Sequence, residues 1–193
     1  MIRRIPIALL ATLMVAPALA QSDKAPERFQ GNMVSMDNAG RRSTAFVVLQ
    51  VDHWGTEEEA MAYLKILKEK GQNGLLETFY DAKEVGFVKV GDRLGYHIVF
   101  AREIPTPEGR IVRAWTDRPI MFAEAMNNTR SRDYPFGVLE IKFVGDKKGE
   151  GTLTAAVQMG YDDKGQLGME RWDTQPYKVL NVKAEPVKEK KKD

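Results

Sequence analysis

Hydrophobic and polar positions alternate along much of the chain, most clearly in its central part. In the stretch YHIVFARE, which starts at Tyr96, alternate side chains share one face of a strand: Tyr96, Ile98 and Phe100. Residues 104–109 contain two prolines and a glycine, which is typical of a turn. Residues 110–116 alternate again, so the pattern predicts an antiparallel hairpin with a loop of about six residues.

Other strands are predicted from apolar alternation or from short apolar runs. They lie at 44–51, 86–90, 137–143, 153–161, 166–172 and 177–183. Residues 44–51 start apolar on both faces, which indicates a central strand with cover on each side. The period of two that runs through 153–161 is typical of a long, half-buried strand.

A helical pattern begins after Thr56. Thr56 can cap the first turn while Glu59 reaches back to it, which is a capping box. Apolar residues then recur at helical spacing, and Gly71 is expected to end this helix. A second helix is expected from residue 74 to about residue 84, so that the two helices form a hairpin laid against the sheet.

Together these elements predict an α+β fold with one domain. We expect a mostly antiparallel, curved or barrel-like sheet of about seven or eight strands, with a helical hairpin inserted after the first strand. A closed barrel of about eight strands can hold a small ligand. The order of strand, two helices and successive strands is also that of small lipid-binding barrels, an analogy of fold that implies no function.

The first twenty residues have the three parts of a secretory signal peptide. Arg3 and Arg4 form its basic start, residues 5–15 its apolar core, and residues 18–20 an A-x-A cleavage site. We therefore expect cleavage after Ala20 and a periplasmic or secreted protein. The apolar run is shorter than the roughly 20 residues that span a membrane, so we expect no membrane span in the mature chain.

The rest of the chain divides by composition. Residues 21–42 show no sustained period and are expected to form a flexible leader, with room for a short edge strand at 29–36. The single domain is placed at 43–184. Residues 185–193 are rich in lysine, and we expect them to be a disordered basic tail.

Charge and composition exclude several function classes. Without the two signal arginines, 27 basic residues balance 27 acidic ones, so no electrostatic feature favours nucleic acid or an anionic membrane. The chain has no cysteine, which excludes disulfides. His53 and His97 are the only histidines, and no zinc site is predicted. No nucleophile elbow or phosphate loop is present, so we predict no catalytic residue and no cofactor.

Residues 117–134 form a dense polar passage between two predicted strands. A connection of this length is unusual unless it carries function or a short helix, and residues 122–126 could form that helix. Two interpretations remain open, an ion-paired crossover loop and an Arg- and Asp-lined ligand site. The candidate ligand contacts are Arg113, Trp115, Arg118, Asn127, Arg130, Arg132 and Tyr134.

Four stretches resemble a family of secreted bacterial proteins of unknown function. They are GRRSTAFVVLQVDHW, LKEKGQNGLLETF, TDRPIMFAEAMNNTRSRDYPFGVLEIKF and WDTQPYKVLNVK. The resemblance covers residues 40–183 and implies a stand-alone exported domain. It brings no activity, ligand or catalytic residue with it.

Three hypotheses about function follow. The first is non-enzymatic binding of a small, partly apolar molecule or of a protein partner in the cell envelope. The second is a hydrolase that uses Asp117, Glu124 and Asp133, which requires two carboxyls within roughly 5 to 10 Å of each other. The third is an envelope scaffold protein that acts through a sheet edge.

Overall fold

The computed structural model describes residues 24–36, 42–92, 94–120, 133–173 and 175–187. These described residues form nine strands and one helix. They are β1 (Glu27–Met36), β2 (Arg42–Val51), α1 (Glu57–Tyr80), β3 (Gly86–Val90), β4 (Tyr96–Thr106), β5 (Gly109–Thr116), β6 (Phe136–Val144), β7 (Gly149–Tyr161), β8 (Leu167–Trp172) and β9 (Tyr177–Pro186).

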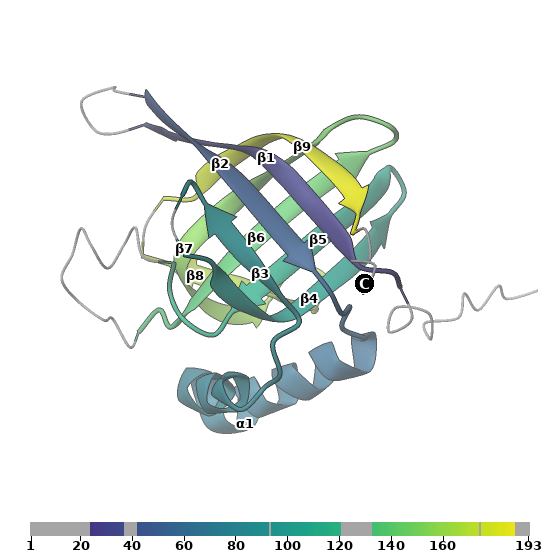
Figure 1. Ribbon diagram of the computed structural model, residues 1–193. Coiled ribbons are helices and arrows are strands. Elements are labelled where there is room, and N and C mark those ends of the chain that lie inside the picture. Colours follow the sequence, from purple (N-terminus) through teal and green to yellow (C-terminus); the bar gives the residue numbers. More distant parts are fainter. Residues whose placement is uncertain (1–23, 37–41, 93, 121–132, 174, 188–193) are drawn as a thin grey trace, which may run out of the picture.

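Eight of these strands form a closed antiparallel barrel (Figure 1). The order around the barrel is β1, β2, β3, β4, β5, β6, β7 and β9, and β9 pairs with β1 to complete the circle. The predicted curved, antiparallel sheet is therefore confirmed, and it closes. Closure leaves no open sheet edge along most of the barrel wall.

Strand β7 changes one of its pairing partners along its length. Its first residues, from Gly149 to Leu153, pair with β9 and complete the barrel. Its last residues, from Val157 to Tyr161, pair with β8 instead. The hairpin of β7 and β8 leaves the barrel in this way, and β8 forms the outer edge of the sheet.

The helix follows the second strand, so the prediction that it follows the first strand is wrong. The range that was expected to be a leader contains β1, which pairs with both β2 and β9 along most of its length. The inward side of β1 holds Phe29 and Met33 but also Glu27 and Gly31, and this mixture hides the strand period. A glycine is required at Gly31 because a Cβ there would press on Val182.

The prediction of two helices in a hairpin is also wrong, because α1 is one helix with a kink. Thr56 caps it, and the capping box with Glu59 is confirmed. The kink lies at Gly71, where φ is 67° and ψ is −166°. Only glycine adopts this combination readily, which explains why the sequence signals a break at that residue.

The loop of the central hairpin is shorter than expected. Thr106 pairs with Gly109, so only Pro107 and Glu108 connect β4 to β5. Gly109 has a φ of 156°, and a Cβ there would overlap the carbonyl oxygen of Phe143 on β6. The glycine therefore permits close approach of three strands at this corner.

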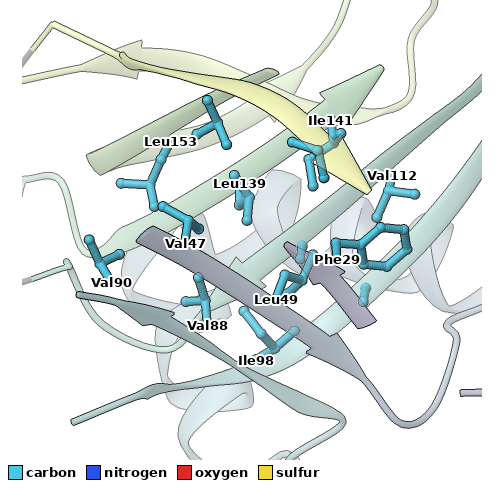
Figure 2. Packing of buried hydrophobic residues seen from close by; sticks show 14 of the residues in the cluster. Phe29, Val47, Leu49, Val88, Val90, Ile98, Val112, Leu139, Ile141 and Leu153 are labelled. Carbon is cyan, nitrogen blue, oxygen red and sulfur yellow. The ribbon is translucent and has the colours of Figure 1, made fainter. Parts of the chain in front are cut away.

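Side chains fill the interior of the barrel (Figure 2). The residues that meet there come from all eight barrel strands and are almost fully buried; ten of them are Phe29, Val47, Leu49, Val88, Val90, Ile98, Val112, Leu139, Ile141 and Leu153. A filled interior of this kind is typical of small barrels. We call this cluster the inner core.

A second hydrophobic cluster, the outer core, lies between the barrel wall and α1. It joins helix residues such as Leu64 and Phe79 to wall residues such as Phe100, Trp115 and Phe136. A β-bulge between Ile98 and Phe100 turns Phe100 outward, so the prediction that both share a face is wrong. Figure 1 shows α1 along the outside of the barrel.

Candidate functional site

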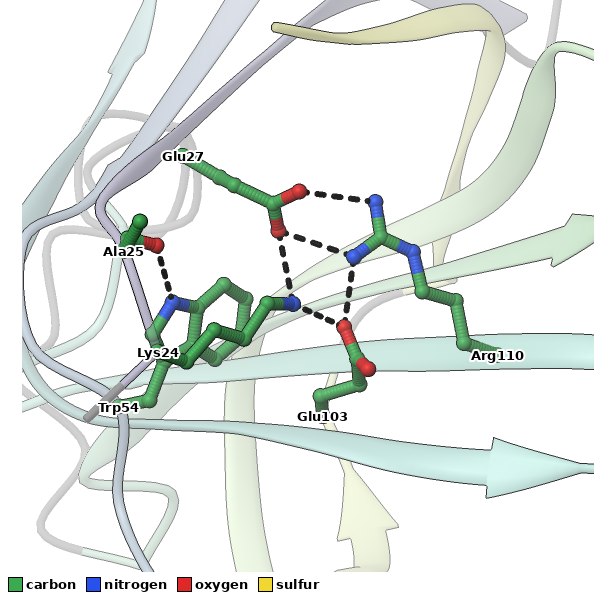
Figure 3. A network of polar contacts seen from close by, with 6 residues as sticks. All are labelled: Lys24, Ala25, Glu27, Trp54, Glu103 and Arg110. Carbon is green, nitrogen blue, oxygen red and sulfur yellow. Dashed lines mark hydrogen bonds and ion pairs between the residues drawn. The ribbon is translucent and has the colours of Figure 1, made fainter. Parts of the chain in front are cut away.

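The two ends of the barrel differ in chemistry. One end, which we call the ion-pair end, carries Lys24, Glu27, Glu103 and Arg110 (Figure 3). Arg110 Nη1 lies 2.9 Å from Glu27 Oε2 and 2.6 Å from Glu103 Oε2. Lys24 pairs with both carboxylates as well. Each side chain is only about a fifth to a quarter exposed, so the network closes this end.

Aromatic rings support the ion-pair end from beneath. The Arg110 guanidinium carbon lies 5.8 Å from the ring centroid of Phe29 and 5.1 Å from that of Phe143. Lys24 Nζ lies 4.1 Å from the ring centroid of Trp54, whose Nε1 donates to the Ala25 carbonyl oxygen at 3.1 Å. These cation–π contacts hold the charged groups above an apolar floor.

The ionisation of this network follows from its geometry. Burial raises the pKa of Glu27, but hydrogen bonds from Arg110 and Lys24 outweigh it, and the net pKa lies below its ordinary value. Burial lowers the pKa of Arg110, but its bonds to Glu27 and Glu103 outweigh this and raise it overall. Glu27 and Arg110 are therefore both charged at neutral pH.

The opposite end of the barrel is lined by tyrosines, and we call it the tyrosine end. Tyr96 belongs to the inner core, while Tyr134 and Tyr177 are half-buried and pack against it. These residues lie at or just before the starts of β4, β6 and β9, which run in the same direction and begin at the same end.

Arg118 is the charged residue of the tyrosine end. Its guanidinium carbon lies 5.3 Å from the ring centroid of Tyr96. The side chain is exposed, and within the described part of the chain no carboxylate forms an ion pair with it. An aromatic ring and an unpaired guanidinium form a surface suited to a flat or apolar group that bears negative charge.

The backbone around Arg118 is held firmly. Thr116 Oγ1 donates to the Arg118 carbonyl oxygen at 2.5 Å and accepts from the Gly137 backbone N–H at 2.8 Å. The Ile120 backbone N–H donates to the Ala155 carbonyl oxygen at 2.8 Å. The backbone next to Arg118 is thus positioned by contacts to β6 and β7.

The structure separates the candidate contacts that the sequence analysis grouped. Arg118 and Tyr134 lie at the tyrosine end. Trp115 does not, because its side chain is 1% exposed in the outer core, where it cannot meet a ligand. Asn127, Arg130 and Arg132 lie outside the described residues, as does Glu124 of the hydrolase hypothesis.

Arg113 serves as an anchor on the outer face of the barrel. Its Nε lies 2.7 Å from Glu140 Oε2, and its Nη1 lies 3.2 Å from Asp162 Oδ2 and donates to the Leu167 carbonyl oxygen at 2.6 Å. These contacts fix the turn between β7 and β8 to the wall. They engage Nε and Nη1 of Arg113, which therefore holds this turn in place.

The sequence analysis missed the charged residues of the ion-pair end. The signal was present at Arg110, which shares its strand face with Val112 and Ala114 of the inner core. A charged residue at the first inward position of a strand indicates a barrel end. Arg102 was also missed; it is 8% exposed and pairs with Glu57 at the start of α1.

The described residues show neither a metal-binding cluster nor a membrane-spanning helix. There, no group of three or more His, Asp or Glu side chains could hold a metal ion. Within the same ranges, no helix has the length and apolar character needed to cross a membrane.

Comparisons with known proteins add no assignment to this geometry. Neither the protein-family models nor the curated proteins nor the solved structures give a match to the chain. The resemblance to a family of secreted bacterial proteins therefore stays a prediction.

Proposed function

We propose that this protein is an exported, non-enzymatic binding protein that takes a small, partly apolar, anionic molecule at the tyrosine end of its barrel. The observation that carries the proposal is Arg118, which is exposed over the ring of Tyr96 without a carboxylate partner in the described part of the chain. An anionic group on the ligand would supply that partner.

The contrast between the two ends supports this choice. At the ion-pair end, Arg110 and Lys24 are already neutralised by Glu27 and Glu103, so a ligand would have to break four ion pairs. At the tyrosine end, no carboxylate among the described residues pairs with Arg118. Binding of a charged ligand costs less free energy where no existing ion pair must be broken.

The filled inner core also restricts where the ligand lies. Leu49, Val88, Ile98 and Leu153 are fully buried against one another, which leaves the ligand to lie across the end of the barrel. Tyrosine rings offer an apolar face and a polar hydroxyl at such a boundary. A partly apolar ligand suits this surface better than a long lipid chain.

The first experiment is native mass spectrometry of the mature protein, purified gently from the periplasm. We expect a bound species of defined mass, and denaturation would release it for identification.

Arg118→Ala should then weaken binding of the identified molecule about tenfold or more, because a charge-assisted contact is lost. The matched control is Arg171→Ala, which removes an exposed arginine on β8 and should change nothing. Detection of the unliganded mass alone would contradict the proposal, and so would equal binding by both variants.

The same preparation tests the protein-partner hypothesis. Among the described residues, strand β8 pairs only with β7, and two exposed aromatic residues, Tyr161 and Trp172, lie on this hairpin. An edge strand of this kind is open to pairing with another chain. Stoichiometric recovery of a second protein, lost on Glu170→Pro in β8, would favour a partner at this edge over a small ligand.

A further inference from the structure

A hollow lies on α1, away from the tyrosine end. The kink at Gly71 divides the helix into two arms, and residues from both arms line a groove of about 500 Å³. Its polar lining comes from Tyr63, Lys70, Glu77, Thr78 and Asp81. We call it the kink groove, and its size falls within the roughly 300–1,000 Å³ typical of small-molecule sites.

The shape of the groove is fixed by specific contacts. Next to the kink, the Gln72 side chain bonds the backbone of Met159 twice: Nε2 donates to the carbonyl oxygen at 2.7 Å, and Oε1 accepts from the N–H at 3.0 Å. Gly74 allows the second arm to approach Lys70, since a Cβ at Gly74 would overlap the Lys70 side chain. The bend is therefore built into the fold.

Two negative charges in the groove lie where they destabilise the helix that carries them. Glu77 and Asp81 are four residues apart at the C-terminal end of α1, and the last turn has no basic residue. Like charges at this spacing repel, and carboxylates at a helix C-terminus oppose the helix dipole. Within the described residues, neither side chain has an ion-pair partner.

Lys70 also lines the groove, from the first arm. It too forms no ion pair within the described part of the chain. The groove lining therefore carries charges of both signs. A ligand with an ammonium group and a carboxylate would match these charges.

The inner side of the groove holds an aromatic ring. Tyr63 makes edge contacts with Phe79 and Phe100, each with ring centroids 5.1 Å apart. Burial, with the nearby charge of Glu59, raises the pKa of Tyr63, so its hydroxyl stays protonated and can donate. The ring fixes the apolar side of the groove, and the hydroxyl adds a donor.

We propose that the kink groove binds a small zwitterion, an amino acid or short peptide with free termini, whose ammonium group faces Glu77 and Asp81 and whose carboxylate faces Lys70. This site is independent of the one proposed at the tyrosine end. The charges of both signs in the groove lining determine the class of ligand.

The test is a titration of the ¹⁵N-labelled mature protein with trialanine, followed by NMR. We expect shifts at the backbone amides of Gly74, Thr78 and Asp81. N-acetyl-trialanine lacks the ammonium group and trialanine amide lacks the carboxylate, and each should bind on the order of threefold more weakly. Higher salt should weaken trialanine binding, because the groove is open to solvent.

Variants separate binding in the groove from unspecific association. Glu77→Gln with Asp81→Asn should reduce trialanine binding severalfold, while Glu58→Gln with Glu69→Gln, elsewhere on α1, should leave it unchanged. Absence of shifts at millimolar peptide, or equal affinity for all three peptides, would overturn the proposal. Arg118→Ala should have no effect here, so failure at this site is distinguishable from failure at the tyrosine end.

Discussion

At the scale of single residues, charge is the feature that distinguishes one barrel end from the other. Arg110 is an inward residue of β5, and its two carboxylate partners come from β1 and β4. A charged group can face a barrel interior only where partners and solvent are within reach. The ion-pair end meets this condition with four charges and with aromatic rings beneath them.

The lowered pKa of Glu27 predicts how stability changes with pH. A carboxyl whose pKa is lower in the folded protein than in the unfolded chain stabilises the fold above its ordinary pKa of 4.5. It loses this contribution as pH falls through the folded value. Glu27→Gln should therefore lower the free energy of unfolding by about 1–2 kcal/mol at neutral pH. Urea unfolding from pH 7 down to acid would measure the difference between variant and parent.

The expected signature is convergence of the two stability curves at acid pH. Glu150→Gln, at an exposed position on β7, provides the control and should follow the parent throughout. If the free energies of unfolding of the Glu27 variant and the parent differed by the same amount at every pH, the loss would come from altered side-chain packing and not from the lost charge.

Some of the candidate site could be predicted from single residues. Arg118 and Tyr134 were expected from the polar passage, and the structure brings both to one barrel end. Trp115 was grouped with them by nearness in sequence, but its place on the outward face of β5 puts it under α1. Strand alternation predicts that Trp115 and Val112 face opposite sides, yet it cannot say which side another element covers.

At the scale of elements, the kinked helix is the feature that shapes the outer surface. Its first arm starts at a capping box, and its second arm starts after Gly71, where the backbone leaves helical geometry. Gln72 ties the bend to β7 through two hydrogen bonds. A bend fixed in this way has an identifiable cause and is not a sign of flexibility.

Gly71→Ala tests how much the fold depends on this bend. No heavy atom lies within 4 Å of where the new Cβ would stand, so the cost comes from the backbone alone. A residue other than glycine in this conformation costs on the order of 1–3 kcal/mol, and thermal unfolding should show that loss. Asn73→Ala, an exposed neighbour, should change stability by less than about 0.5 kcal/mol. Equal stability of both variants would mean that Gly71 does not require its positive φ.

Most elements could be predicted from the sequence because their apolar positions repeat regularly. α1 has both a cap and a glycine break. β7 was found from its apolar alternation, but its predicted unbroken period of two is wrong: a register shift against β6 leaves Leu153 and Ala155 in the inner core and puts Val157 and Met159 in the outer core. β1 was largely missed because Gly31 and Glu27 occupy inward positions, which interrupts the apolar pattern. The bulge in β4 could not be predicted either, since an extra residue shifts the period without any change in composition.

At the scale of the whole molecule, the barrel depends on close contacts where its strands meet. Gly151 lies on β7 and pairs with Ile141 on β6 and with Val179 on β9. A Cβ at Gly151 would overlap the carbonyl oxygen of Glu140. The glycine therefore lies where β7 joins β6 to β9 and completes the circle.

Gly151→Ala should destabilise the barrel by about 1–3 kcal/mol, because a backbone atom must move to make room. The free energy of unfolding in urea would measure this loss. Gly145→Ala is a useful comparison, since it places a Cβ in open space at a turn with a φ of 52°. If the Gly151 variant proved as stable as the parent protein, the close approach of β6 and β7 would be disproved.

The pairing of β1 with β9 has a consequence for how the protein is made. Glu27 lies opposite Pro186 in this pair, so the contact joins residues far apart in the chain. Contacts between distant residues form late and slow the folding of a domain. A nascent chain cannot complete the circle before β9 has left the ribosome, and until then β1 and β7 present unpaired backbone to their surroundings.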